Sequence, residues 1–149
     1  MEAAFKEALI KAGVDFEDTL EKRLMGSEEL YEKCLNMFAE NTNLKGYEDA
    51  VAARDYGEAF NNIHALKGTA ANIGVIKIED ARQMSALPSF EERKALLDAD
   101  TDRGAIPHLE VVNEALRFDR YNDDSFREWS QKMISETEGI IGLIKSYRR

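Results

Sequence analysis

The sequence predicts an all-α protein built as a bundle of antiparallel helices. Apolar residues recur at a helical period along most of the chain, and capping residues precede several of these stretches. No stretch alternates like a half-buried strand over a convincing length. Because 149 residues suffice for one full hydrophobic core, we expect a single helical domain over residues 1–149.

The N-terminal third is expected to form two short helices and a long one. Residues 2–12 and 15–26 each carry a helical apolar pattern that ends at a glycine. Ser27, with two acids directly after it, is a good cap for a helix that keeps its period to about residue 53. Within that helix Gly46 is a weak point that is expected to mark a bend. The side chains expected to point inward in the first helix are Phe5, Leu9 and Ile10.

The central helix is expected over residues 55–73. Asp55 and Glu58 form a capping box at its start, and Gly74 is suited to end it. A short turn and a further helix over about 77–87 follow. A tight turn between two helices makes them antiparallel neighbours.

Three more helices are expected after the proline at position 88. Ser89 opens a short one with a second capping box, and residues 98–104 form an acidic loop. Pro107 suits the first turn of the next helix. Asp123 caps the last helix, which continues close to the end of the chain.

The central helix sorts into two faces. At 100° per residue, His64, Lys67, Gly68 and Ala71 share one side, at positions i, i+3, i+4 and i+7. One imidazole is therefore expected in the open, beside one ammonium group and next to residues with small side chains. The apolar stripe expected to face the core consists of Ala59, Ile63, Leu66, Ala70 and Ile73.

The chemistry of this exposed face suits a phosphoryl group. An exposed histidine is largely neutral at pH 7 and offers a ring nitrogen with a lone pair, which makes it a nucleophile. An adjacent lysine contributes a charge-assisted contact to a phosphoryl oxygen. No Asp or Glu occurs over residues 59–78, where the 29 acids among 149 residues would place about four. These features favour phosphoryl acceptance on His64, with docking of a partner that carries the rest of the machinery.

The stretch His64–Gly68, with Gly74 ten residues after the histidine, resembles the histidine-containing phosphotransfer (HPt) domain of two-component phosphorelays. The resemblance covers roughly residues 15–87 and, more loosely, the last helix. It implies an antiparallel four-helix bundle with its core over about 15–87 and 123–149. Short N-terminal helices and an extra helical segment over about 88–122 would be additions to that bundle.

The resemblance also implies the function of a phosphocarrier. His64 would accept a phosphoryl group from the aspartate of a receiver domain, or from a sensor histidine kinase, and pass it to the receiver aspartate of a response regulator. Lys67 would steady the phosphate. Gly68 would permit close approach of the partner. The residues expected to take part in docking are Gly68, Ala71, Phe60 and Asn61, with core packing an equally good interpretation of Phe60.

The expected partners supply what this sequence lacks. No glycine-rich phosphate loop or other nucleotide motif is present, so we expect no enzymatic activity of its own and no cofactor. Magnesium is expected on the partner receiver domain. The segment over residues 88–122 carries its own apolar positions, and we expect it to fold as helices away from His64, where it modulates partner choice or association. A monomer is expected.

Composition excludes several classes of function. The net charge of −9 disfavours general binding to nucleic acid or to an anionic membrane. No run of about 18 apolar residues is present, and the first residues lack the pattern of a signal peptide. The single cysteine, Cys34, excludes an internal disulfide and is expected to be a buried structural thiol. A cytoplasmic location is therefore expected.

Two other functions stay open at this point. One is a helical docking module that binds partners without carrying phosphate. The other is an enzyme, either the phosphoacceptor domain of a chemotaxis-type kinase or a chain with its own phosphatase chemistry. The lack of a nucleotide motif weakens the kinase alternative. Transfer of labelled phosphate from a phosphorylated receiver domain separates the docking module from the phosphocarrier.

Metal binding is a weaker alternative. Three carboxylates have the spacing of a calcium loop, but Gly104 and Glu110 each come one residue too late for that motif. A solvated acidic turn is the favoured interpretation. His108 has no cysteine or second histidine at ligand spacing, so a zinc site is not expected. The three carboxylates are Asp98, Asp100 and Asp102.

Overall fold

The computed structural model describes residues 1–77, 81–100 and 102–148. Its described residues form helices joined by turns, with one isolated antiparallel bridge between Ile76 and Gly104 and no longer strand pairing. The prediction of an all-α protein is confirmed for this part of the chain. The helices are α1 (Ala3–Lys11), α2 (Phe16–Arg23), α3 (Glu28–Ala39), α4 (Asn43–Ala52), α5 (Tyr56–Asn72), α6 (Ala81–Ser85), α7 (Phe90–Ala99), α8 (Leu109–Arg117) and α9 (Asp124–Ser146).

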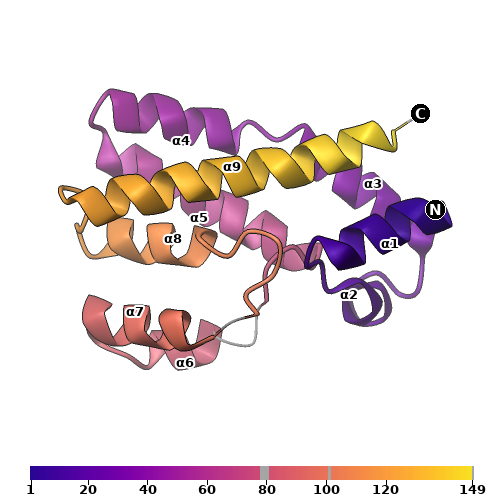
Figure 1. The fold of residues 1–149 in the computed structure, drawn as a ribbon, viewed down its shortest axis with the longest axis horizontal. Helices are drawn as coiled ribbons and strands as arrows, with labels where there is room; N and C mark the ends of the chain where they lie inside the picture. The colour runs from indigo at the N-terminus through magenta and orange to yellow at the C-terminus, as the bar shows by residue number, and fades with distance from the viewer. Residues whose placement is uncertain (78–80, 101, 149) are drawn as a thin grey trace.

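The long helix α9 runs along the molecule, and the other helices are arranged around it (Figure 1). In one half, α5 packs against α4 and α8, and α8 packs against α9. In the other half, α1 and α3 contact α9 near its C-terminal end, and the N-terminus lies there too. Helices α6 and α7 lie outside α8, on the side away from α4. Helix α8 is therefore an inner helix with neighbours on opposite sides.

A single large core joins these elements. Its buried apolar side chains come from α1 to α5, from Phe90 at the start of α7, and from α8 and α9, so both ends of the chain contribute to it. Eight consecutive residues of α8, Leu109–Leu116, are buried. A smaller cluster of Met84, Leu97 and Val111 joins α6 and α7 to the outer side of α8. The segment that sequence analysis set apart from the bundle thus supplies a central helix.

The N-terminal elements differ from expectation in three places. Helices α1 and α2 are confirmed, but Ile10 is 48 % exposed and does not point inward. The long helix expected over residues 27–53 is wrong, because α3 ends at Ala39 and α4 begins at Asn43. The side-chain oxygen of Asn41 accepts a hydrogen bond from the backbone N–H of Asn43 at 3.0 Å, which favours a turn over continued helix. Cys34 is only partly buried, against the core.

Gly46 lies within α4 at a point of close approach to α5. A Cβ atom at this position would lie 2.3 Å from Oδ1 of Asn62, a residue of α5. The Asn62 amide is held in place, because it donates a hydrogen bond to the carbonyl oxygen of Glu58 at 3.0 Å. The glycine therefore lets α4 and α5 pack closely at this point.

The central helix α5 begins and ends as predicted. The Asp55 side chain accepts a hydrogen bond from the backbone N–H of Glu58 at 3.1 Å. Gly74 follows the helix with a φ of +77°, a conformation that favours glycine. The hydroxyl of Tyr31 on α3 donates to the carbonyl oxygen of Ile73 at 2.6 Å, which fixes this end of α5. Burial raises the pKa of the Tyr31 hydroxyl well above its usual range.

Helices α7 and α9 also follow their predicted caps. Ser89 and Asp123 each accept a hydrogen bond from the backbone N–H three residues on, at the start of α7 and α9. Helix α8 begins at Leu109 with His108 as its N-cap, so Pro107 precedes the helix and does not lie in its first turn. Of the helix expected over 77–87, the structure shows α6, and residues 78–80 lie outside the described part. Among the described residues, no helix combines the length and the apolar content that crossing a membrane needs.

Candidate functional site

The two faces predicted for α5 are confirmed. His64 and Gly68 are exposed, while Lys67 and Ala71 are partly buried at the edge of the same side. The whole predicted apolar stripe is buried. The imidazole therefore lies in the open on a helix whose opposite side is fixed in the core.

The rings of Phe60 and His64 stack one helical turn apart. Their centroids are 5.4 Å apart and the ring planes differ by 25°. Phe60 is partly buried and packs against the core, so its ring restricts the positions open to the imidazole. Asn61, the next residue along the helix, is exposed. Both interpretations offered for Phe60, core packing and a place beside the site, agree with this position.

Gly68 has no packing role in the described structure. No heavy atom outside its own helix backbone and its chain neighbours lies within 4 Å of the position where its Cβ would be. This contrasts with Gly46, where the same atom would meet Asn62. Open space beside an exposed mid-helix glycine leaves room for another molecule to approach the backbone.

Helix α8 presents a polar stripe to α5. Its charged and amide side chains occur at i, i+3, i+4 and i+7, and three of them lie on a buried stretch of the helix. Lys67 lies close to Glu110, whereas Phe60, two turns earlier in α5, lies under the guanidinium of Arg117. The two helices thus run antiparallel with these stripes in contact. The stripe consists of Glu110, Asn113, Glu114 and Arg117.

This position of α8 corrects one expectation. The segment over residues 88–122 was expected away from His64, but Arg93, Glu114 and Arg117 all line a pocket together with His64. The reason is that the apolar side of α8 belongs to the main core against α5 and α9. Its polar stripe is then brought beside the exposed face of α5.

Lys67 is paired with a buried acid. Its Nζ lies 3.1 Å from Oε2 of Glu110, and the two side chains are 19 % and 10 % exposed. Burial raises the pKa of the Glu110 carboxyl, while the nearby Lys67 ammonium opposes that shift. The ammonium is thus close to His64 in sequence but already bound to a carboxylate.

The pocket beside His64 has a volume of about 400 Å³. Within its lining, Nη1 of Arg93 lies 2.8 Å from Oε2 of Glu114, and Nε of Arg117 lies 3.5 Å from the same oxygen. Arg93 also donates from Nε to the carbonyl oxygen of Leu87 at 2.8 Å. The pocket lining consists of His64, Lys67, Met84, Ser85, Arg93, Glu114 and Arg117.

Charge balance makes this pocket suitable for an anion. Among its described lining residues, the cations are Lys67, Arg93 and Arg117, and the acid is Glu114. With Glu110 included as the partner of Lys67, positive charge exceeds negative charge by one. This surplus is notable because the chain as a whole carries a net charge of −9.

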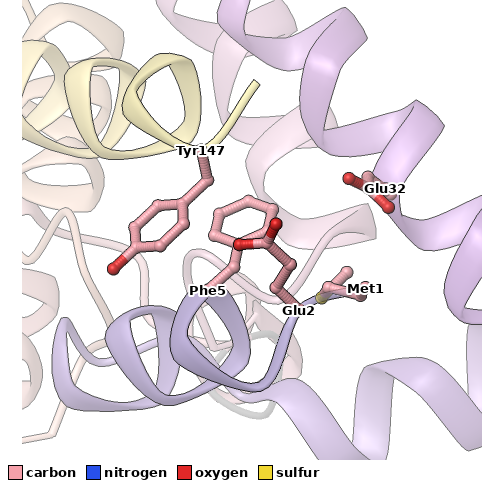
Figure 2. A pocket seen from close by; sticks show the side chains of 5 residues that line it. All are labelled: Met1, Glu2, Phe5, Glu32 and Tyr147. Carbon is pink, nitrogen blue, oxygen red and sulfur yellow. The ribbon is translucent and has the colours of Figure 1, made fainter. Parts of the chain in front are cut away.

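A second pocket, lined by carboxylates and aromatic rings, lies at the opposite end of the molecule. Figure 2 shows the ring of Phe5 beside that of Tyr147, with the Glu2 side chain near Phe5 and Glu32 across the pocket. The two ring centroids are 5.0 Å apart. The acidic side chains make this pocket unsuitable for a phosphoryl group, so the site beside His64 is the better candidate.

The residues considered for metal binding have other partners. Asp98 pairs with Lys94 at 2.5 Å, and Asp102 pairs with Lys77 at 2.6 Å. Nδ1 of His108 lies 2.6 Å from Oε2 of Glu136 on α9. Among the residues that the structure describes, no three side chains of the types that bind metals gather at one point. Residue 101 of the acidic loop lies outside the described part.

Sequence reasoning missed the contribution of α8 and Arg93 to the site. The signal was present as the i, i+3, i+4, i+7 spacing over residues 110–117, but such a pattern usually marks a solvated face. The acids of this stripe are instead buried, and their partners lie far away in the sequence: Lys67 on α5 and Arg93 on α7.

No known family model matches this sequence, and the chain matches no curated protein and no solved structure. The motif around His64 and the geometry of the pocket beside it are therefore the features that point to a function.

Proposed function

We propose that this protein is a phosphocarrier of a two-component phosphorelay. His64 accepts a phosphoryl group from the aspartate of a receiver domain, or from a sensor histidine kinase, and a response-regulator receiver aspartate then takes it. The observation that carries the proposal is the exposed His64 imidazole, which lines one pocket together with three cationic side chains of the described structure.

The transfer needs only a nucleophile and a charged environment on this chain. The lone pair of the unprotonated ring nitrogen of His64 attacks phosphorus, and a nitrogen–phosphorus bond forms. The bond between phosphorus and the aspartate oxygen breaks, and its electron pair leaves with the carboxylate. The second transfer reverses these steps on another receiver. The stacked ring of Phe60 limits the orientations of the imidazole during both.

The exposed side of α5 offers a surface on which a partner can dock. Asn61, His64 and Gly68 are exposed along it, and Ala71 is partly buried at its edge. The open space at Gly68 suits a partner backbone. Magnesium belongs to the receiver domain in this proposal, where it binds the aspartyl phosphate.

The four-helix bundle implied by the resemblance is assigned here to α4, α5, α8 and α9. Contacts join α4 to α5, α5 to α8 and α8 to α9. A hydrogen bond of 2.6 Å between the hydroxyls of Tyr47 and Ser130 joins α4 back to α9. Burial raises the pKa of Tyr47 to about 12, in keeping with a neutral hydroxyl that bridges the two helices. In this assignment α8, not an added segment, is the third helix.

Transfer of label from a phosphorylated receiver tests the function. A panel of isolated receiver domains carrying labelled phosphate is incubated with the protein, and the acid-labile, base-stable adduct is measured. Label is expected on the wild-type chain and not on His64→Gln, with unchanged helix content by circular dichroism. His108→Gln is the matched control and should keep the label.

Three results would contradict the proposal. Label that persists in His64→Gln, or that disappears in His108→Gln, would place the acceptor elsewhere. Binding of receiver domains without any label on His64 would favour the docking module instead.

A further inference from the structure

Among the described residues, three cations lie close enough to His64 to be considered as contacts for a phosphoryl group, and they differ in what already binds them. Lys67 is the one suggested by sequence, but its ammonium is held 3.1 Å from Glu110. To reach a phosphoryl group it would have to leave a carboxylate that is 10 % exposed. A buried acid that loses its partner is unfavourable, so this exchange opposes binding.

Arg93 has more contacts within the protein than Lys67 has. Its side chain is 13 % exposed, its Nε donates to the carbonyl oxygen of Leu87, and its Nη1 binds Glu114. Its guanidinium also lies 5.0 Å from the centre of the Phe118 ring. These contacts fix Arg93 as the main partner of the Glu114 carboxylate, which is 1 % exposed.

Arg117 is the least bound of the three. Its side chain is 40 % exposed, and its Nε lies at 3.5 Å from Glu114, beyond a short hydrogen bond. Within the described part of the chain its guanidinium donates no hydrogen bond. A guanidinium carries five N–H donors in a planar fork that matches phosphate oxygens, so Arg117 retains capacity for such a ligand.

Arg117 and His64 lie close to the same aromatic ring and line the same pocket. Its guanidinium carbon lies 5.5 Å from the centre of the Phe60 ring, and the same ring stacks on His64. Both side chains also line the pocket of about 400 Å³. Because one liquid-phase water takes roughly 30 Å³, the pocket has room for a phosphoryl group and water. The guanidinium and imidazole thus share one aromatic neighbour and one cavity.

The charges around Glu114 also distinguish Arg117 from Arg93. Glu114 is shared by two arginines, and Arg93 makes the shorter contact with it. One arginine suffices to neutralise that carboxylate, so the second provides the positive charge in excess. The more exposed Arg117 is the one able to turn toward a new anion.

We propose that Arg117, rather than Lys67, is the cation that contacts the phosphoryl group on His64, with Glu114 and Arg93 as positioning residues. This inference rests on the proposed function, because it names a contact for the group that His64 would carry. It assigns to the segment over residues 88–122 a direct part in the site.

Titration of the phosphoryl group itself tests this contact. The protein is phosphorylated on His64 with phosphoramidate, a small donor that needs no docking, and the ³¹P chemical shift is followed against pH. A cation beside a phosphoryl group favours its dianion and lowers its second pKa. Arg117→Gln should raise that pKa by about one unit, whereas Lys67→Gln should raise it by less than about half as much.

Matched variants separate charge from structure. Arg117→Lys keeps the charge but not the fork, and should give an intermediate pKa. Arg127→Gln removes an exposed arginine of α9 that does not line this pocket, and should leave the titration unchanged. Circular dichroism and melting temperature check that each variant is folded.

The outcomes distinguish the inference from the function. If the Arg117→Gln titration matches wild type, or if Lys67→Gln shifts it more, the assignment of Arg117 is wrong while the phosphocarrier function stands. If receiver domains fail to label His64 but phosphoramidate succeeds, the proposed phosphocarrier function is wrong. The contact between Arg117 and the phosphoryl group can still be tested by the titration. Failure of both donors would overturn both.

Discussion

The Nζ atom of Lys67 and the Oε2 atom of Glu110 lie 3.1 Å apart across the contact between α5 and α8. This pair ties the helix that carries His64 to a helix from the segment that sequence analysis set apart. Lys67 is therefore not a solvated surface lysine. The consequences for stability, for pH and for the site can each be measured.

Lys67→Ala should destabilise the protein by about 1–3 kcal/mol, because it leaves a buried carboxylate without its partner. The matched control is Lys45→Ala. Lys45 pairs with Asp49 at 3.2 Å, but both side chains are mostly exposed, so its loss should cost below about 0.5 kcal/mol. Urea unfolding of both variants measures the difference.

A double-mutant cycle isolates the pair itself. Adding Glu110→Gln to Lys67→Ala should recover part of the lost stability, because a neutral amide is less costly to bury than an unpaired carboxylate. If Lys67→Ala and Lys45→Ala lower the free energy of unfolding equally, the Lys67–Glu110 pair contributes no more than a solvent-exposed ion pair.

The titration of Glu110 should appear in the pH dependence of stability. Burial raises the pKa of its carboxyl in the folded state, with Glu114 adding to the shift and Lys67 and Arg103 opposing it. The folded protein then holds a proton that the unfolded chain has released, so this contribution is full below the ordinary glutamate pKa of about 4.3 and is lost as pH rises through the folded value.

Comparison with Glu110→Gln reveals this contribution. The free energy of unfolding of wild type, relative to the variant, should fall as pH rises from about 4 and then level off. Urea titrations at intervals of half a pH unit would show it. A difference that rises with pH would mean that the Lys67 ammonium outweighs burial and that the pKa of Glu110 is lowered.

Local features were predictable from sequence because they depend on neighbouring residues. The capping side chains of Ser27, Asp55, Ser89 and Asp123 each accept a hydrogen bond from the N–H three residues on, as expected. Their partners lie within one helical turn, so a short stretch of sequence contains all the information.

The features that sequence could not supply depend on distant partners. Glu110, Asn113 and Glu114 have the spacing of a solvated face, yet all three are buried. The two acids are paired with Lys67 and Arg93 from other helices. Oδ1 of Asn113 is buried without a hydrogen-bond partner among the described residues. The exposure of His64 and Gly68 on α5 was predicted correctly, whereas the pairing of Lys67 with the polar helix beside it was not.

The two mid-helix glycines at positions 46 and 68 should respond differently to alanine. Gly68→Ala should stabilise by roughly 0.5–1 kcal/mol, because its Cβ would enter open space and alanine favours helix. Gly46→Ala gains the same propensity, but its Cβ would displace the Asn62 side chain and break the bond to Glu58. Thermal unfolding should therefore rank Gly68→Ala above wild type and above Gly46→Ala.

A larger residue at position 68 should separate docking from chemistry. Gly68→Gln should leave the melting temperature level or raise it, since glutamine favours helix over glycine. Transfer from a phosphorylated receiver should slow severely, because the side chain fills the space through which a partner would approach. Phosphoramidate needs no docking, so its reaction with His64 should change little. Unaffected receiver transfer would mean that the partner approaches His64 from another side.

The segment over residues 88–122 should be required for folding as well as for the site. Its helix α8 is buried over Leu109–Leu116, and Leu109 itself is fully buried. Leu109→Ala should cost about 2–5 kcal/mol, as for other large-to-small changes in a core. Replacing the segment with a flexible linker should remove the cooperative unfolding transition, because α5 and α9 would each lose a packed neighbour. A linker variant that unfolds cooperatively and still accepts phosphate from a receiver would show that α8 is dispensable to both fold and site.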